Sequence, residues 1–141
     1  SQICASTEAE IFKYSHNASG YVQIILFNIM YDLAKKLGAN WDHVHRAILA
    51  DPLISNRYAQ PIHKTGRGAG GGCFIKDMAA LKLHVKKHLP KDRLAHAVLE
   101  AVEQKNIELL TGTNKDLDLL AGVYGSRVVK RAPKRGKKRV Q

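Results

Sequence analysis

A glycine-rich stretch at residues 66–77, GRGAGGGCFIKD, ends in residues whose types can do chemistry. Cys73 falls near the expected start of a helix, where free backbone N–H groups and the helix dipole stabilise a thiolate. Lys76 adds positive charge, and Asp77 lies four residues after the cysteine on the same helix face. Glycine backbone lets a substrate approach, so the thiolate could attack a carbonyl while the carboxylate orients a water. The pattern indicates either thioester chemistry or a buried, inert cysteine.

A lysine and an amide stand four residues apart in the first expected helix. Lys13 and Asn17 therefore share one helix face and can point at one spot. Two such donors could stabilise a developing oxyanion. Taken alone, however, the pair is more typical of a solvent-exposed face.

The glycines before the cysteine also match the letters of a dinucleotide fingerprint. Gly66, Gly68 and Gly71 satisfy G-x-G-x-x-G. That fingerprint binds a dinucleotide only directly after a buried strand of a βαβ unit. The preceding residues, YAQPIHKT, do not have the pattern of such a strand. We therefore expect that this loop does not hold a dinucleotide in the usual way.

Two histidine pairs have spacings that suit metal ligands. His84 and His88 are four residues apart, and His43 and His45 are two apart. Lysines surround the first pair and would repel a cation. Because no carboxylate or cysteine completes either set, the sequence favours the absence of a metal site.

Helical periodicity dominates the chain, so the expected fold class is all-α: a bundle of about four helices with one long N-terminal helix. Pro61 and the glycines mark the stretch before Cys73 as irregular, and no convincing strand is present. The helices are expected at residues 6–38, 41–50, 74–89 and 92–110, with a short helical turn at residues 117–121.

The apolar faces of two helices predict what these helices pack against. Around residues 24–30 the first helix is apolar on nearly all sides, which indicates burial by more than one neighbour, including a second copy of the chain. In the helix at residues 92–110, helical spacing places five apolar residues on the inner side: Leu94, Val98, Ala101, Val102 and Leu109.

The formal net charge of +11 comes mostly from one end of the chain. Residues 126–141 hold eight basic residues and no acidic one, whereas the other 15 basic residues stand against 12 acidic ones. This end has no aromatic side chain on which a base could stack. We expect a disordered, solvated tail, and binding to nucleic acid is the less favoured alternative.

The sequence carries no sign of a membrane or secretory protein. It has no run of 18 or more apolar residues, so we expect no membrane span. The start, SQICASTEAE, is acidic and lacks the apolar stretch of a signal peptide. Cys4 and Cys73 make no disulfide framework, which favours a reduced, cytoplasmic setting.

Four separated segments resemble, in this order, the central domain of the UDP-glucose/GDP-mannose dehydrogenase family. They are AEIFKYSHNA, LAKKLGANWDHV, DPLISN and GAGGGCFIKD, and the resemblance covers about residues 7–106. It implies a helical domain that forms a homodimer through its long helix and follows an NAD-binding Rossmann domain. It also implies a four-electron oxidation of a nucleotide sugar, from a C6 alcohol to a carboxylate, with NAD as cofactor.

The same resemblance implies roles for individual residues. Cys73 is expected to be the nucleophile that forms a thiohemiacetal and then a thioester. Lys13 and Asn17 are expected to steady the oxyanionic intermediates, and Asp77 to assist proton transfer and hydrolysis with a water. Lys76 is expected to contact the cofactor or the substrate. The residues expected to fold over the nucleotide sugar are Lys64, Gly66, Arg67, Gly68 and Gly70.

This sequence departs from the family pattern at four positions. Leu53 stands where the family usually has an arginine that reaches into the partner's substrate site. Ala69 stands in place of an aromatic residue, Gly72 in place of a serine or threonine, and Ile29 in place of a glutamate. The Cys, Lys, Asn and Asp set is intact.

The expected organisation has three parts: residues 1–6 as the junction to an NAD-binding domain missing from this chain, residues 7–125 as the central catalytic-cysteine domain, and residues 126–141 as the basic tail. We expect the chain alone to be inactive. The alternative is a non-catalytic helical dimerisation module whose tail binds acidic partners or nucleic acid. The helical domain of a hydroxyacid dehydrogenase is a weaker third option, because Gly-Gly-x-Cys argues against it.

Overall fold

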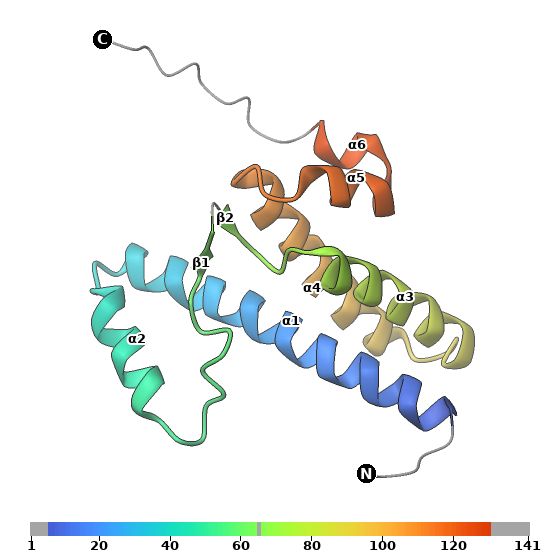
Figure 1. The fold of residues 1–141 in the computed structure, drawn as a ribbon, viewed down its shortest axis with the longest axis horizontal. Helices are drawn as coiled ribbons and strands as arrows, with labels where there is room; N and C mark the ends of the chain where they lie inside the picture. The colour runs from blue at the N-terminus through green and yellow to red at the C-terminus, as the bar shows by residue number, and fades with distance from the viewer. Residues whose placement is uncertain (1–5, 65, 131–141) are drawn as a thin grey trace.

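The structure is a computed structural model that describes residues 6–64 and 66–130 (Figure 1). Within these residues the regular elements are helices apart from a small hairpin, which confirms the all-α class. The expected junction up to residue 5 and the tail from residue 131 lie outside the described residues. The elements are α1 (Ser6–Lys36), α2 (Trp41–Ala50), β1 (Ile62–His63), β2 (Gly66–Arg67), α3 (Gly72–His88), α4 (Arg93–Gly112), α5 (Leu117–Tyr124) and α6 (Ser126–Val129).

The long helix α1 runs along the molecule, with α3 and α4 packed against it and α2 folded back at its C-terminal end (Figure 1). The helix limits agree closely with the expected ranges. Asn40 caps α2 by accepting a hydrogen bond from the Asp42 N–H at 2.9 Å. α3 begins at Gly72, so Cys73 lies in its first turn. α5 extends beyond the expected turn. α6 occupies residues 126–129, which corrects the expectation that a disordered tail begins at residue 126.

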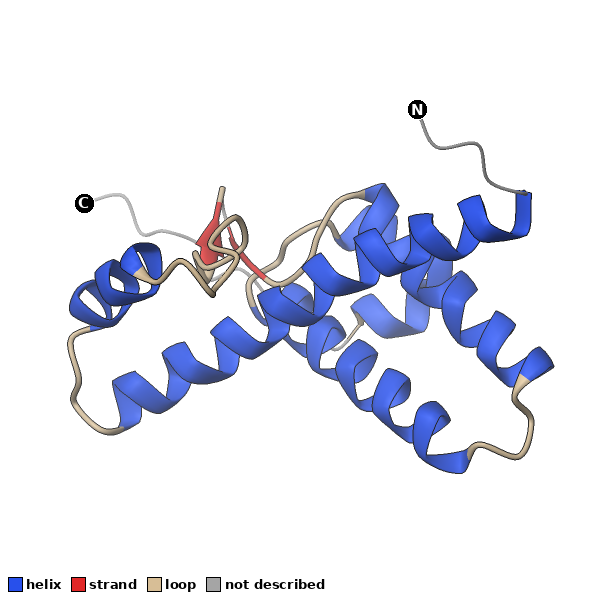
Figure 2. Cartoon of the chain, turned by 90° about the horizontal axis from the view of Figure 1, so that it is seen from below, coloured by secondary structure: helices blue, strands red, loops and turns tan. Residues whose placement is uncertain are grey.

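A two-stranded antiparallel hairpin corrects the expectation that the chain contains no strand. Ile62 pairs with Arg67, and His63 pairs with Gly66 (Figure 2). Each strand has two residues, which is too short to show the alternation of polar and apolar residues that identifies a strand in a sequence. The second strand of the hairpin begins residues 66–71, which we call the glycine loop and which lead directly into α3.

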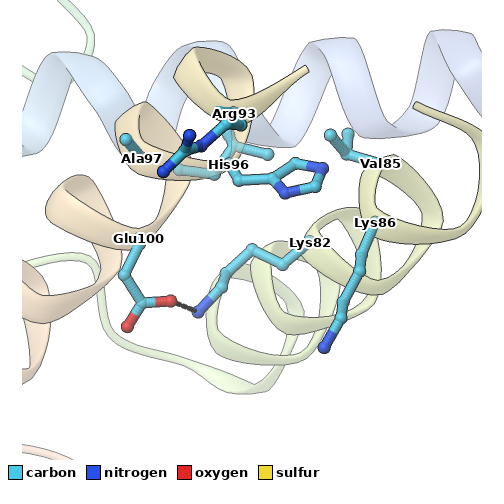
Figure 3. Close-up of a pocket in the computed structure, with 8 residues that line it drawn as sticks. Lys82, Val85, Lys86, Arg93, His96, Ala97 and Glu100 are labelled. Carbon is cyan, nitrogen blue, oxygen red and sulfur yellow. Dashed lines mark hydrogen bonds and ion pairs between the residues drawn. The ribbon is translucent and has the colours of Figure 1, made fainter. Parts of the chain in front are cut away.

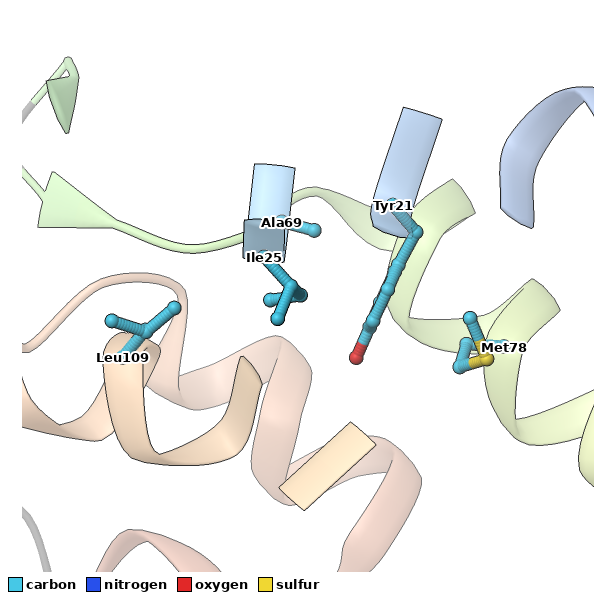
Figure 4. Close-up of a cluster of buried hydrophobic side chains, with 5 residues drawn as sticks. All are labelled: Tyr21, Ile25, Ala69, Met78 and Leu109. Carbon is cyan, nitrogen blue, oxygen red and sulfur yellow. The ribbon is translucent and has the colours of Figure 1, made fainter. Parts of the chain in front are cut away.

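The main apolar cluster forms where α1, α3, α4 and the glycine loop meet (Figure 4). Tyr21 and Ile25 come from α1, Met78 from α3 and Leu109 from α4. Ala69 of the glycine loop is fully buried in the same cluster. The glycine loop is therefore part of the core and not a slack linker. Burial also raises the pKa of the Tyr21 phenol, which keeps this side chain neutral.

The inner face of α4 differs from the face that apolar spacing predicted. Leu94 and Val98 are 78% and 61% exposed. α4 buries Glu103 and Asn106 in their place, whereas the burial of Leu109 confirms the prediction for that residue. The prediction for Leu94 and Val98 was wrong because this face buries polar side chains whose partners lie far away in the sequence.

A buried ionic cluster joins α3, α4 and α5. The Lys82 ammonium is paired with the carboxylates of Glu100 and Glu103, and Tyr124 donates a hydrogen bond to Glu103 Oε1 at 2.6 Å. Burial opposes the charge of Lys82, but the two carboxylates outweigh it and raise the pKa of this ammonium. Burial, and then the contact with Glu103, raises the pKa of Tyr124. The two carboxylates therefore share one cation, and the more deeply buried of them, Glu103, also accepts the hydrogen bond of Tyr124.

We expect Lys82→Met to lower the free energy of unfolding by about 3 kcal/mol or more, because it leaves the 4%-exposed Glu103 carboxylate without a cation. Urea denaturation measures this loss. The matched control is Lys105→Met, which removes a more exposed pair with Glu108 at 2.8 Å and should cost about 1 kcal/mol or less. Equal losses in the two variants would contradict a special role of the buried cluster.

An apolar stripe on the outer side of α1 has no partner among the described residues. Its members recur at three- and four-residue spacing, so they form one continuous face of the helix. The exposed residues of this stripe are Val22, Leu26, Ile29, Met30, Leu33 and Leu37.

Within the described residues, no helix combines the length and apolar composition that a membrane crossing requires.

Candidate active site

The first turn of α3 presents a free cysteine at the protein surface. Cys73 is exposed and forms no disulfide. Gly71, the residue before α3, has φ +82°, and Gly68 has φ +93°. Both values lie in the left-handed region, where side chains other than glycine are strained. The chain therefore turns sharply at two glycines before it delivers Cys73 to the start of the helix.

Asp77 brings together three of the four residues expected to be catalytic. Lys13 Nζ lies 3.0 Å from Asp77 Oδ1, and Asn17 Nδ2 donates a hydrogen bond to Asp77 Oδ2 at 2.5 Å. Lys13 and Asn17 are on α1, whereas Asp77 lies on α3, one turn after Cys73. Two donors from α1 thus converge on the Asp77 carboxylate of α3, four residues after Cys73.

The electrostatics of this group favour a protonated lysine. The hydrogen bond and charge of Asp77 are the largest effects, and they raise the pKa of Lys13. The charge of Cys73, when ionised, acts in the same direction more weakly. Lys13 is 60% exposed, whereas the Asp77 side chain is 13% exposed. The ion pair with Asp77 therefore keeps Lys13 positively charged at the protein surface, where Cys73 is also exposed.

In Asp77→Asn, we expect the pKa of Lys13 to fall toward the ordinary 10.5, because the neutral amide removes the charge that raises it. A heteronuclear NMR titration of the lysine side chains measures this shift. Asp118→Asn, at an exposed position on α5, is the control and should leave Lys13 unchanged. An unchanged Lys13 titration in Asp77→Asn would contradict the ion pair.

A cavity of about 570 Å³ lies beside the glycine loop. Three of the residues expected to contact substrate, Lys64, Gly68 and Gly70, line it. Gly71 and Phe74, close to Cys73 in the chain, line it as well. Its remaining charged or titratable lining residues are Arg57, Tyr58, His63, Lys115 and Asp116. Among the charged lining residues, cations thus outnumber the one carboxylate, which suits an anionic ligand.

The other residues expected to bind substrate or cofactor lie elsewhere. Arg67 turns toward α1, where its guanidinium donates to Asn28 Oδ1 at 2.8 Å and pairs with Asp32 at 2.8 Å. Gly66 is buried against Thr113. Lys76 is exposed on α3 and has no ion pair within the part of the chain that the structure describes. The roles expected for these three residues stay predictions.

The structure adds loop contacts that sequence reasoning missed. Asn106 bonds to both backbone groups of Ala69, and Lys115 Nζ donates to the Gly68 carbonyl at 2.9 Å. No motif marks these residues, because each acts on backbone that lies 37 or more positions away in the sequence. Asn106 can be recognised as a buried polar residue only once it is known which face of α4 is buried.

A second cavity, of about 470 Å³, lies between α3 and α4 (Figure 3). Lys82, Lys86, Arg93 and His96 are among its lining residues. It opens near the C-terminal end of α3, whereas Cys73 is at the N-terminal end, so it is not part of the candidate site. Among the described residues, no three His, Cys, Asp or Glu side chains gather as metal ligands would.

Residues 7–107 match the UDP-glucose/GDP-mannose dehydrogenase family, central domain, and the chain belongs to this family. It is 32% identical over 97 residues to a UDP-glucose 6-dehydrogenase of Rickettsia conorii, and 35% over 91 residues to one of Rhizobium meliloti. It is 28% identical over 120 residues to UDP-glucose 6-dehydrogenase TuaD of Bacillus subtilis.

The similarity extends over only part of each relative. The three alignments cover 69%, 64% and 85% of this chain but only 22%, 20% and 24% of the relatives. The chain therefore spans about a fifth to a quarter of the length of the curated relatives it matches. No solved structure gives a significant match.

The described residues do not form the βαβ unit that the usual dinucleotide fingerprint requires. Their one sheet is the two-stranded hairpin, which provides no βαβ unit. The N–H groups of Ala69 and Gly71 are already bonded, to Asn106 and Asp116, so they do not point at a pyrophosphate. The match of this loop to G-x-G-x-x-G therefore has a structural explanation other than dinucleotide binding.

Proposed function

We propose that this chain is the catalytic-cysteine domain of a nucleotide-sugar 6-dehydrogenase, which oxidises a sugar C6 alcohol to a carboxylate. The observation that carries the proposal is the convergence of Lys13 and Asn17 on Asp77, one helical turn from the exposed Cys73. Membership in the family supports it independently, because the relatives are UDP-glucose 6-dehydrogenases.

In this proposal the Cys73 sulfur adds to the C6 aldehyde and forms a thiohemiacetal. The Lys13 ammonium and the Asn17 amide stabilise the negative charge on the intermediate oxygen. Oxidation of the thiohemiacetal gives a thioester, and Asp77 orients the water that hydrolyses it. NAD supplies the hydride acceptors for this four-electron oxidation, and the domain that binds most of it lies outside this chain.

The cavity beside the glycine loop is the proposed binding site of the nucleotide sugar. Its lysine, arginine and histidine side chains complement the negative charge of a pyrophosphate. Phe74, which follows Cys73 in the chain, and the glycine backbone also line this cavity, and glycine leaves room for a ligand to approach. UDP-glucose is the first substrate to test, because the relatives carry that name. The free thiol that the reaction needs fits a reducing, cytoplasmic setting.

With its NAD-binding domain supplied in the same chain or in trans, we expect the protein to form NADH from UDP-glucose. Cys73→Ser should lower kcat by about a thousandfold or more, because it removes the nucleophile. Absorbance of NADH measures the rate, and Cys4→Ser is the control that should keep it. Full turnover by Cys73→Ser would contradict the thioester mechanism.

The apolar stripe on α1 supports a homodimer as part of the proposal. Two copies packed through this stripe would bury side chains that are otherwise exposed, such as Leu26 at 50% and Leu33 at 49%. The stripe is continuous with the stretch around residues 24–30 that the sequence marks as apolar on nearly all sides. A second chain is the partner that would cover both.

We expect Leu26→Glu with Leu33→Glu to turn a dimer into a monomer, because two carboxylates would be buried without partners. Sedimentation velocity measures the mass of the particle. Leu83→Glu, at a 69%-exposed position on α3, is the control and should remain dimeric. A dimer that survives the double substitution would contradict this interface. The alternative, a non-catalytic dimerisation module, predicts the same dimer but no NADH formation from UDP-glucose, even by the unsubstituted protein with its NAD-binding domain supplied.

A further inference from the structure

The glycine loop is held from the α4 side by a pair of hydrogen bonds to one buried amide. Asn106 Oδ1 accepts from the Ala69 N–H at 2.7 Å, and Asn106 Nδ2 donates to the Ala69 carbonyl at 3.0 Å. Asn106 is only 1% exposed. Both backbone groups of a fully buried loop residue are thus satisfied by a single side chain.

Three further side chains, which follow Asn106 in the sequence, hold the residues on either side of Ala69. Thr113 Oγ1 accepts from the Arg67 N–H at 3.0 Å, Lys115 Nζ donates to the Gly68 carbonyl at 2.9 Å, and Asp116 Oδ2 accepts from the Gly71 N–H at 2.8 Å. We call this group the loop clamp. Its members are Asn106, Thr113, Lys115 and Asp116.

The loop clamp explains why the loop is so rich in glycine. A Cβ on Gly66 would lie 2.6 Å from Thr113 Oγ1, and one on Gly68 would lie 2.8 Å from Asn106 Oδ1. A Cβ on Gly70 would overlap Asp116 Oδ2. Each glycine therefore leaves the space that a clamp side chain needs to reach the backbone.

Lys115 is an unusual choice for a purely structural contact. Its side chain is buried with the residue 7% exposed, and its bonding partner is a backbone carbonyl. Burial lowers the pKa of Lys115, although the nearby charge of Asp116 acts in the opposite direction. Three of the clamp residues, moreover, lie beyond residue 107, where the family match ends.

We propose that the loop clamp positions Cys73, by fixing the start of α3 relative to the Lys13–Asn17–Asp77 group. The route is short: Asp116 holds Gly71, Gly71 precedes the first residue of α3, and Cys73 is the second residue of that helix. The clamp residues are positioning residues, since they act through the loop. The inference rests on the proposed function only for the task that Cys73 performs.

Asp116 provides the sharpest test, because its side chain is half-buried and bonds to the residue that caps α3. In a Cys4→Ser background, Asp116→Ala should speed amide exchange at Gly71 by about tenfold, as measured by NMR. It should also slow the alkylation of Cys73 by iodoacetamide by about threefold, because the start of α3 no longer holds Cys73 in a fixed position beside the Lys13–Asn17–Asp77 group. Asp116→Asn keeps an acceptor oxygen and should restore both values.

The direction of the alkylation change separates positioning from simple loosening. A loop that only became looser would expose Cys73 further and speed alkylation, so a faster or unchanged rate in Asp116→Ala overturns the proposal. Asp118→Ala, two residues further on and exposed, is the matched control and should change neither value.

Lys115→Met, with Lys115→Arg as its rescue, repeats the test if Asp116→Ala does not fold. It removes the bond to the Gly68 carbonyl, and the same slower alkylation is expected. A rate that is unchanged or faster in a folded Lys115→Met overturns the proposal as well. No substrate is used in either series, so a failure of Cys73→Ser to abolish turnover would refute the proposed function and leave this inference standing.

Discussion

The paired hydrogen bonds between Asn106 and Ala69 are the interaction on which the rest of the structure depends. They allow a backbone segment with no regular hydrogen-bonding partner to enter the core between α1 and α4. Without them, a buried N–H and a buried carbonyl would be unsatisfied, at about 1–3 kcal/mol each. With them, the chain can arrive at α3 by a sharp turn and present Cys73 at the surface.

Helix α3 carries two charged groups that have different physical settings. At the Lys82 end, the Glu103 carboxylate is 4% exposed and is bonded by both Lys82 and Tyr124, which suits a structural contact between helices. At the Cys73 end, Asp77 is 13% exposed and its lysine partner is 60% exposed, which leaves the group open to a ligand. α3 thus takes part in both a structural contact and an accessible site. The contact between Lys82 and Glu103 fixes the position of α3 against α4.

The sequence predicts α1 to α4 well, because helical periodicity, Asn40 and the glycines mark where they begin and end. It also brings Cys73 and Asp77 onto one face, since four residues make about one turn. The buried face of α4 could not be predicted in this way. Glu103 and Asn106 read as polar surface, and their partners Lys82 and Ala69 lie 21 and 37 residues away. The direction of Arg67 likewise depends on α1, which is 39 residues distant.

The central claim is that this fold places Cys73 where it adds to the C6 carbonyl of a nucleotide sugar. The most direct measurement uses the C6 aldehyde of UDP-glucose labelled with ¹³C at C6, added to the protein without an electron acceptor. The account predicts a new ¹³C resonance of a sulfur-bonded carbon, which is absent in Cys73→Ala and weakened in Lys13→Met. A spectrum that shows only free aldehyde and its hydrate, or an adduct that survives Cys73→Ala, would contradict it.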